Sequence, residues 1–207
     1  GDRKTFFVDV IIPIPVSNTF TYRVPFELND TLIKGARVVV PFGRAKLYTG
    51  LIVHIHENPP EGYQAKYIES VLDEAPIITG TQYKLWTWMS EYYMAPIGDV
   101  MNAALPANFK LASETKIVLH PEAEHNVALL DDREYTIYEA LEIQGELDLK
   151  EIATILGIKT IQPIIKKMIE KRVLVTKEDL KNKFTPKSQI FVSLAAEYQS
   201  ESTLNAL

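Results

Sequence analysis

The sequence contains no cysteine and no long hydrophobic run. Without cysteine, a disulfide framework, a thiolate zinc site, a cysteine nucleophile and an iron–sulfur cluster are excluded within this chain. The longest apolar candidate, residues 10–16, is interrupted by Pro13 and Pro15 and falls short of the ~18–20 residues that a membrane-spanning helix needs. The first residues, Gly-Asp-Arg-Lys, lack the apolar stretch of a signal peptide, which predicts a cytoplasmic protein with no membrane contact. Gly1 in place of Met suggests a piece of a longer protein.

Catalytic and nucleotide-binding motifs are also missing. We find no GxxxxGK[ST] phosphate loop, no GxGxxG, no HExxH and no Gly-x-Ser-x-Gly elbow. His54 and His56 share one face of a predicted strand and could form half of a metal site, or simply a sheet surface. Because no third ligand is spaced to join them, the sheet surface is favoured and no metal is expected. The chain is therefore not expected to be an enzyme.

The distribution of charge is more informative than its total. The chain has 207 residues and a net charge of −5, which alone argues against nucleic-acid binding. However, residues 114–151 hold eleven acids and three bases, whereas residues 159–187 hold nine bases and three acids. Residues 33–50 contain four bases and no acid. Two basic segments are thus masked by one acidic segment, although a charge run can also be only a solvated face.

The hydrophobic pattern changes period along the chain. Short runs of β-branched and aromatic residues predict strands at 6–12, 19–24, 36–40, 48–56 and 67–72, which suggests a small barrel or sandwich. The spacing of Leu85, Trp86, Met89, Tyr92 and Tyr93 predicts a helix that buries one face, capped by Thr79 or Thr81. A second short helix is expected at 100–105.

The second half follows the order of a winged helix. A strand at 116–120 precedes three helices; the third is expected to be capped by Thr160. Strands at 173–176 and 189–194 then predict a hairpin with a basic loop. The fold class is therefore α+β, with a barrel-like domain and helices over residues 1–106, a linker at 107–115 and a winged-helix domain at 116–207.

Both predicted domains carry candidate DNA-binding residues. The apolar stripe of the third helix leaves Lys159, Gln162, Lys166 and Lys167 on its other face, and Lys181 and Lys183 lie in the predicted basic wing. This face suits the major groove and the wing suits phosphates, so DNA contact with little sequence preference is favoured. A winged helix can instead dock another protein, and a sequence-specific regulator is a weaker third option.

Aromatic and basic residues also alternate in the first domain. Phe20, Tyr22, Phe42 and Tyr48 lie among Arg23, Arg44 and Lys46. Aromatic faces beside a cationic groove hold single strands by stacking. The competing interpretation is that Phe20 and Tyr22, which share a face of one strand, belong to the core, and the spacing alone favours this second interpretation.

A series of motifs resembles the N-terminal region of the primosomal protein N′ (PriA) family, the bacterial replication-restart DNA helicases. These motifs are VIIPIP at 10–15 with TFTY at 19–22, GARVVVPFG at 35–43, VLD at 71–73, EYYMAPIGDV at 91–100 and ALP at 104–106. The resemblance implies that the first domain captures the 3′ end of the nascent leading strand at a stalled fork and that the winged helix contacts duplex DNA. It implies ATP-driven helicase lobes, with ATP, Mg and a cysteine-ligated zinc element, only for the full-length protein. Single-strand-binding protein and primosome proteins are the further partners it implies.

The resemblance also assigns a pocket for the 3′-hydroxyl end to Phe20, Thr21, Gly43 and Lys66, with Arg44 and Lys46 as auxiliary contacts to the DNA backbone. In this assignment an aromatic ring supports the terminal base, a hydrogen-bonding group reads the hydroxyl and a lysine attracts phosphate. Some family members carry Asp at the position of Thr21, and a carboxylate is a stronger acceptor than a hydroxyl.

Overall fold

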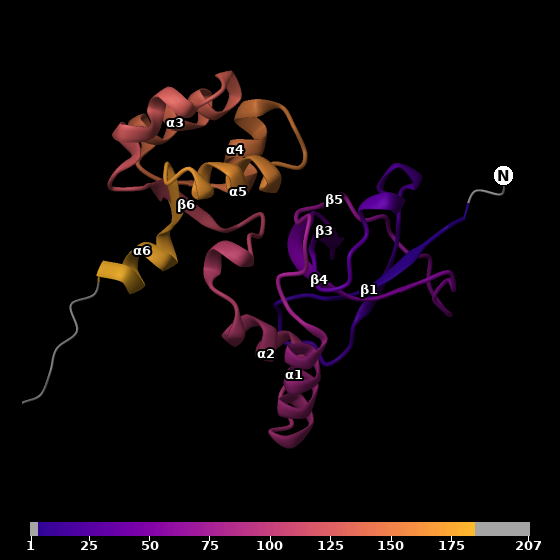
Figure 1. The fold of residues 1–207 in the computed structure, drawn as a ribbon. Helices are drawn as coiled ribbons and strands as arrows, with labels where there is room; N and C mark the ends of the chain where they lie inside the picture. The colour runs from indigo at the N-terminus through magenta and orange to yellow at the C-terminus, as the bar shows by residue number, and fades with distance from the viewer. Residues whose placement is uncertain (1–3, 185–207) are drawn as a thin grey trace, which may run out of the picture.

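The computed structural model describes residues 4–184, and its side chains through residue 180. The first part contains strands β1 (Phe7–Ile11), β2 (Phe20–Arg23), β3 (Arg37–Phe42), β4 (Lys46–His56) and β5 (Ser70–Val71), then helices α1 (Gly80–Tyr92) and α2 (Ile97–Ala104). The second contains β6 (Lys116–Leu119), α3 (Asp132–Gln144), β7 (Leu147–Asp148), α4 (Leu149–Leu156), α5 (Gln162–Glu170), β8 (Leu174–Thr176) and α6 (Lys177–Phe184). Short 3₁₀ turns are η1 (Phe26–Thr31), η2 (Ala107–Phe109) and η3 (Ala123–Leu129). The fold is α+β, as predicted (Figure 1).

The first sheet is antiparallel with the order β2-β1-β4-β3-β5, and it closes on itself. The Arg23 amide at the β2 edge donates to the Lys66 carbonyl at 2.8 Å, and the Ile68 amide donates to the Arg23 carbonyl at 3.0 Å. These bonds join the edge strand β2 to the segment that leads into β5. The closure confirms the barrel-like domain, because a closed sheet satisfies edge groups that an open sheet leaves exposed.

Strand β4 separates two hydrophobic cores. Ile52 points into the barrel with Val10, whereas Leu51 and Val53 point outward against α1 and α2. Gly50 permits this packing, because a Cβ there would lie 2.3 Å from the Cγ1 atom of Val10. The alternation of strand side chains thus lets one long strand serve both cores.

Helix α1 begins as predicted, but most of its aromatic side chains are not buried. Thr79 and Gln82 form a reciprocal capping box. Of the helix side chains only Trp86 is buried, whereas Tyr92 and Tyr93 are 67% and 65% exposed, and Leu85 is also exposed. Figure 1 shows the reason: α1 projects past the barrel. The apolar spacing predicted the helix correctly but not how much of it the sheet covers.

The segment at 107–115 is attached along β4. The Thr49 amide and hydroxyl both donate to the Leu111 carbonyl, at 3.0 and 2.6 Å. The Leu47 amide donates to the Ser113 hydroxyl at 2.9 Å, and the Ser113 amide donates to the Leu47 carbonyl at 3.0 Å. The Leu111 side chain meanwhile belongs to the core of the second part. The residues expected to be a linker therefore connect the two parts through the sheet.

The second part has the three helices and the sheet expected of a winged helix, with the strand order β7-β6-β8. Capping boxes at Asp131 and Asp148 begin α3 and α4, and Gly157 ends α4 in the left-handed conformation. The predicted cap at Thr160 is wrong. Helix α5 begins at Gln162 with Pro163 in its first turn and no side-chain cap, which is tolerated because first-turn amides lack helical partners.

The predicted basic loop after β8 is instead the helix α6. Thr176 and Asp179 begin it, because the Asp179 amide donates to the Thr176 hydroxyl at 3.1 Å and that hydroxyl donates back to the Asp179 carboxylate at 2.8 Å. The Asp179 carboxylate also accepts from the Asn108 amide at 3.0 Å. The predicted strand at 189–194 lies outside the described residues. No helix among the residues described is long and apolar enough to cross a membrane.

A buried ion pair lies where the two parts meet. The Arg37 guanidinium binds both carboxylate oxygens of Asp73 at 2.7 and 2.9 Å, and its backbone amide binds the same carboxylate at 2.9 Å. The Phe109 ring packs over the guanidinium, 4.5 Å from its centroid. Lys166 of α5 donates to the Leu72 carbonyl at 2.7 Å and lies 3.5 Å from the Asp73 carboxylate. The pair thus contacts the barrel, the connecting segment and α5.

We expect Asp73→Asn to lower the free energy of unfolding by about 3–5 kcal/mol, because it leaves the buried Arg37 charge without its partner. The two side chains are only 5% and 7% exposed, so water does not compensate. Urea denaturation measures the change. Glu57→Gln is the matched control, since it breaks an exposed pair with Lys4, worth no more than about 1 kcal/mol. Equal effects of both substitutions would contradict the role given to Arg37.

The effect of Asp73→Asn on the free energy of unfolding depends on pH. Burial alone raises the pKa of Asp73, but the hydrogen bonds from Arg37 and the charges of Arg37 and Lys166 outweigh it and hold the pKa below its ordinary 3.8. A depressed pKa contributes stability above the unfolded value, and this contribution is lost as the pH falls through the folded value. The difference between the wild type and Asp73→Asn therefore shrinks below about pH 4.

Candidate nucleic-acid interface

One pocket contains all four residues predicted to bind a 3′ end. Phe20 and Thr21 come from β2, Gly43 from the β3–β4 turn and Lys66 from the segment that precedes β5. The pocket has a volume of about 190 Å³ and is also lined by Tyr22, Pro41, Phe42, Tyr63 and Gln64. The closure of the barrel thus brings together four residues that lie up to 46 positions apart in the sequence.

The aromatic residues of this pocket both line it and pack beneath it. Tyr22 is buried in the barrel core, and its hydroxyl donates to the Pro41 carbonyl at 3.1 Å. Phe20 is half-buried and meets Phe42 edge to face, with ring centroids 4.9 Å apart. The core and stacking interpretations of Phe20 are therefore compatible, since a supported ring can present a face to a base.

The Thr21 side chain lies on the other face of its strand. Its hydroxyl donates to the Asp9 carboxylate at 2.7 Å, across the β1–β2 pair. Neighbouring strand residues point to opposite faces, so this hydroxyl points away from the side that Phe20 and Tyr22 share. His54 and His56 flank the same carboxylate at 3.4 and 3.2 Å.

Asp9 is held ionised by these neighbours. Burial raises the pKa of Asp9, but the Thr21 hydrogen bond and the two histidines together lower it by more, so that the pKa lies below its ordinary 3.8. Over the described part of the chain, no group of three or more histidine, aspartate or glutamate side chains is arranged to hold a metal ion. Asp9 was missed by the sequence argument, although it is the one charged residue within the apolar run of β1.

The backbone of Thr21 faces the pocket instead. Its amide donates to the Tyr63 hydroxyl at 3.0 Å, on the edge of β2 that is not paired with β1. The hydrogen of this phenol has only a long contact with the Thr21 carbonyl, at 3.5 Å. Such a contact is weak, which leaves both the phenol hydrogen and the carbonyl able to bind a ligand hydroxyl. Tyr63 itself is half exposed.

The cationic side of the pocket is formed at the β3–β4 turn. Lys66 donates to the Gly43 carbonyl at 3.0 Å, and Gly43 holds the left-handed conformation with φ +69°. Arg44 lies in the same turn and Lys46 begins β4, where it forms an exposed pair with Glu114 at 2.8 Å. The predicted backbone contacts therefore adjoin the pocket.

The lysines of the predicted DNA-binding face form ion pairs within the chain, although Lys159 and Lys167 stay exposed. Lys159 pairs with Glu69 and Lys166 with Asp73, so both reach the barrel domain. Lys167 lies 3.2 Å from the Glu134 carboxylate and 3.4 Å from that of Asp131, both from the start of α3. The prediction that Gln162 lies on an exposed face is wrong. Its side chain is only 1% exposed, because it shares a face of α5 with Ile165, three residues on, which belongs to the core of the second part.

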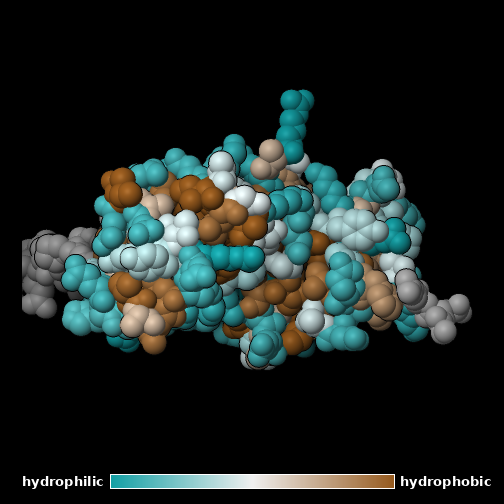
Figure 2. Space-filling model, turned by 90° about the horizontal axis from the view of Figure 1, so that it is seen from above, coloured by the Kyte–Doolittle hydropathy of each residue, from teal (hydrophilic) through white to brown (hydrophobic). Residues whose placement is uncertain are grey.

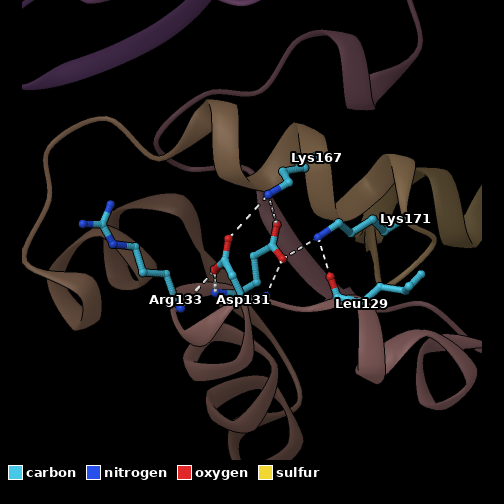
Figure 3. A network of polar contacts seen from close by, with 6 residues as sticks. Leu129, Asp131, Arg133, Lys167 and Lys171 are labelled. Atoms are coloured by element: carbon cyan, nitrogen blue, oxygen red, sulfur yellow. Dashed lines mark hydrogen bonds and ion pairs between the residues drawn. The ribbon is translucent and has the colours of Figure 1, made fainter.

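Figure 3 shows how α5 is tied to α3. Lys167 and Lys171 converge on carboxylates there, and Lys171 donates to the fully buried Glu134 at 2.6 Å and to the Leu129 carbonyl at 2.7 Å. Burial raises the pKa of Glu134, but the two lysines and the Asp131 amide together lower it by more, so that the pKa lies below its ordinary 4.5. Lys181 and Lys183 lie in α6, and their side chains fall outside the described residues. Seen from above, hydrophobic and hydrophilic side chains alternate in small areas across the molecule (Figure 2).

Two family models match these two parts of the chain. Residues 9–106 match the 3′ DNA-binding domain (3′BD) of PriA, and residues 114–179 match a winged helix domain. The first match covers the barrel with the pocket and the helices α1 and α2, and the second covers β6 through the start of α6. The class is thus a 3′ DNA-binding domain joined to a winged helix.

The relatives carry the name Replication restart protein PriA. That of Buchnera aphidicola subsp. Schizaphis graminum is 27% identical over 129 residues, which are 62% of this chain and 17% of the relative. That of Bacillus subtilis is 30% identical over 115 residues, which are 54% and 14%. That of Chlamydia muridarum is 25% identical over 176 residues, which are 83% and 22%. The chain is therefore similar to the N-terminal region of the PriA replication restart proteins, as the sequence motifs predicted.

Proposed function

We propose that this chain is the DNA-binding region of a replication-restart protein, which recognises branched or stalled forks by the 3′ end of a DNA strand. The observation that carries the proposal is the single pocket that collects Phe20, Thr21, Gly43 and Lys66. The proposal assigns no ATP, magnesium or zinc chemistry to these residues, because the sequence has neither a phosphate loop nor a cysteine. Helicase activity, and contact with single-strand-binding or primosome proteins, belong to the proposal for the whole protein only.

In this proposal each wall of the pocket has a separate role. Phe20 supports the terminal base, and Lys66 attracts a phosphate beside it. The 3′-hydroxyl is read by the open backbone of Thr21 together with the Tyr63 phenol, which offer an acceptor and a donor. A 3′-phosphate is rejected, because it is larger and offers the Thr21 carbonyl no neutral hydroxyl donor. Asp9 binds the Thr21 hydroxyl on the opposite face of β2.

We expect Phe20→Ala to weaken the binding of a single strand ending in a 3′-hydroxyl by about 1–3 kcal/mol, since the ring stacks a base. Fluorescence anisotropy with a 5′-labelled oligonucleotide measures the loss. Phe20→Tyr is the control, because it keeps the aromatic face. If Phe20→Ala binds as well as the wild type while remaining folded by circular dichroism, the stacking role is wrong.

We expect Tyr63→Phe to reduce the preference for a 3′-hydroxyl over a 3′-phosphate, because it removes the phenol while keeping the ring. Thr21→Val is the matched comparison: it removes the hydroxyl that points to Asp9 and keeps the backbone, so the preference is retained. Paired titrations with the two oligonucleotide ends test both variants. A lost preference in Thr21→Val alone would assign the reading to the side chain, and equal wild-type affinity for both ends would refute the pocket.

A second candidate function concerns the winged helix. Lys159, just before α5, and Lys166 and Lys167 of α5 contact Glu69, Asp73 and Glu134 of this chain, which favours a protein-docking role over entry into a DNA groove. In this alternative the winged helix holds its own barrel domain and, in the whole protein, helicase lobes or a primosome partner.

Lys167→Gln, combined with Lys159→Gln, separates the two roles. If α5 docks on protein, the double variant binds duplex DNA as the wild type does and unfolds at a lower temperature. If α5 contacts phosphates, the slope of log affinity against log salt falls by about 0.9 for each lost contact. We expect the first result for this helix, measured by duplex binding at several salt concentrations and by thermal unfolding.

A further inference from the structure

A second pocket lies between the barrel and the winged helix. It has a volume of about 340 Å³ and is lined by residues of the β3–β4 turn, of the connecting segment and of the first turns of α4 and α5. Five cationic side chains line it and no acidic one does: Arg44, Lys46, Lys66, Lys150 and Lys159. Its floor is apolar, with Leu47, Leu149 and Ile161. Such a lining favours an anionic ligand.

Two of these cations and one buried amide are unused by the protein. Within the part of the chain that the structure describes, Arg44 and Lys150 have no ion-pair partner, whereas Lys46 and Lys159 pair with Glu114 and Glu69. Gln162 lines the same pocket and is 99% buried by its exposure of 1%, yet its side-chain oxygen has no hydrogen-bond partner. The unpaired atom is a hydrogen-bond acceptor, as phosphate oxygens are, so it adds nothing to the binding of a phosphate, and the unpaired cations carry the argument.

The second pocket adjoins the 3′-end pocket. Pro41, Gly43 and Lys66 line both, so the β3–β4 turn forms the wall between them. A strand that ends in the first pocket therefore needs to pass only this turn to reach the second. The two pockets differ in chemistry: the first has aromatic walls suited to a base, and the second has cations suited to the phosphates that precede it.

We infer that the interdomain pocket binds backbone phosphates of the DNA strand whose 3′ end lies in the first pocket, so that the winged helix supplies one wall of a site shared by both domains. Arg44 and Lys150 bind from opposite sides, one from the barrel and one from α4. This inference rests on the proposed 3′-end function and adds to it a role for the winged helix that does not require α5 to enter a groove.

The test uses the double variant Arg44→Gln with Lys150→Gln and 5′-labelled oligonucleotides of two and eight nucleotides, all ending in a 3′-hydroxyl. Both side chains are exposed, so the fold tolerates their replacement. We expect the eight-nucleotide strand to bind at least tenfold more weakly and its salt slope to fall by about 1.4, at about 0.7 for each phosphate contact on a single strand. The dinucleotide should bind as it does to the wild type.

Lys34→Gln combined with Lys84→Gln is the charge-matched control, because both lysines are exposed and lie outside both pockets. An unchanged affinity and slope for the eight-nucleotide strand would overturn the inference. The inference would also be overturned if the double variant lost the binding of inorganic phosphate, measured by thermal stabilisation of the protein, while its affinity for both strands stayed unchanged. Failure of the 3′-end function shows separately, as equal wild-type affinity for strands ending in a 3′-hydroxyl and in a 3′-phosphate.

Discussion

The relative position of the two domains depends on the buried ion pair between Arg37 and Asp73. A buried charge is stable only with its partner, and here each partner also binds something else. Arg37 carries the Phe109 ring of the connecting segment, and Asp73 attracts Lys166 of the winged helix. The pair therefore joins the strand β3 to the helix α5, and it holds α5 beside the barrel together with the Lys159–Glu69 pair and the bonds of the connecting segment to β4.

Local signals in the sequence predicted most of the elements. All five barrel strands lie within three residues of their predicted ranges, because their β-branched runs are bounded by turn residues. The cap at Thr79 was predictable because a capping box depends on residues only three apart. The helix α6 has a comparable signal in Thr176 and Asp179, which the prediction of a basic loop did not consider.

The site was less predictable, because it depends on contacts between distant residues. Resemblance led to Phe20, Thr21, Gly43 and Lys66, and the closed barrel places them in one pocket. Tyr63 could not be found in this way, since it reaches Thr21 from a loop 42 residues along the chain. Charge counts misjudged α5 for a related reason. A lysine on the polar face of a helix is predicted to be solvated. Only the packing of the domains shows that Lys166 meets Asp73 and that Lys159, just before the helix, meets Glu69.

The closure of the barrel has one more consequence. Along the free edge of β2, the peptide groups that point outward belong to alternate residues, Thr21 and Arg23. The peptide groups of Arg23 form hydrogen bonds with the segment that leads into β5. At Thr21 this backbone pairing has ended, and the amide binds the phenol of Tyr63 instead. The first pocket is thus the gap left where the backbone pairing between β2 and the segment before β5 stops, and its size depends on that point. A sequence in which this pairing continued for two more residues would close the barrel there and leave no pocket.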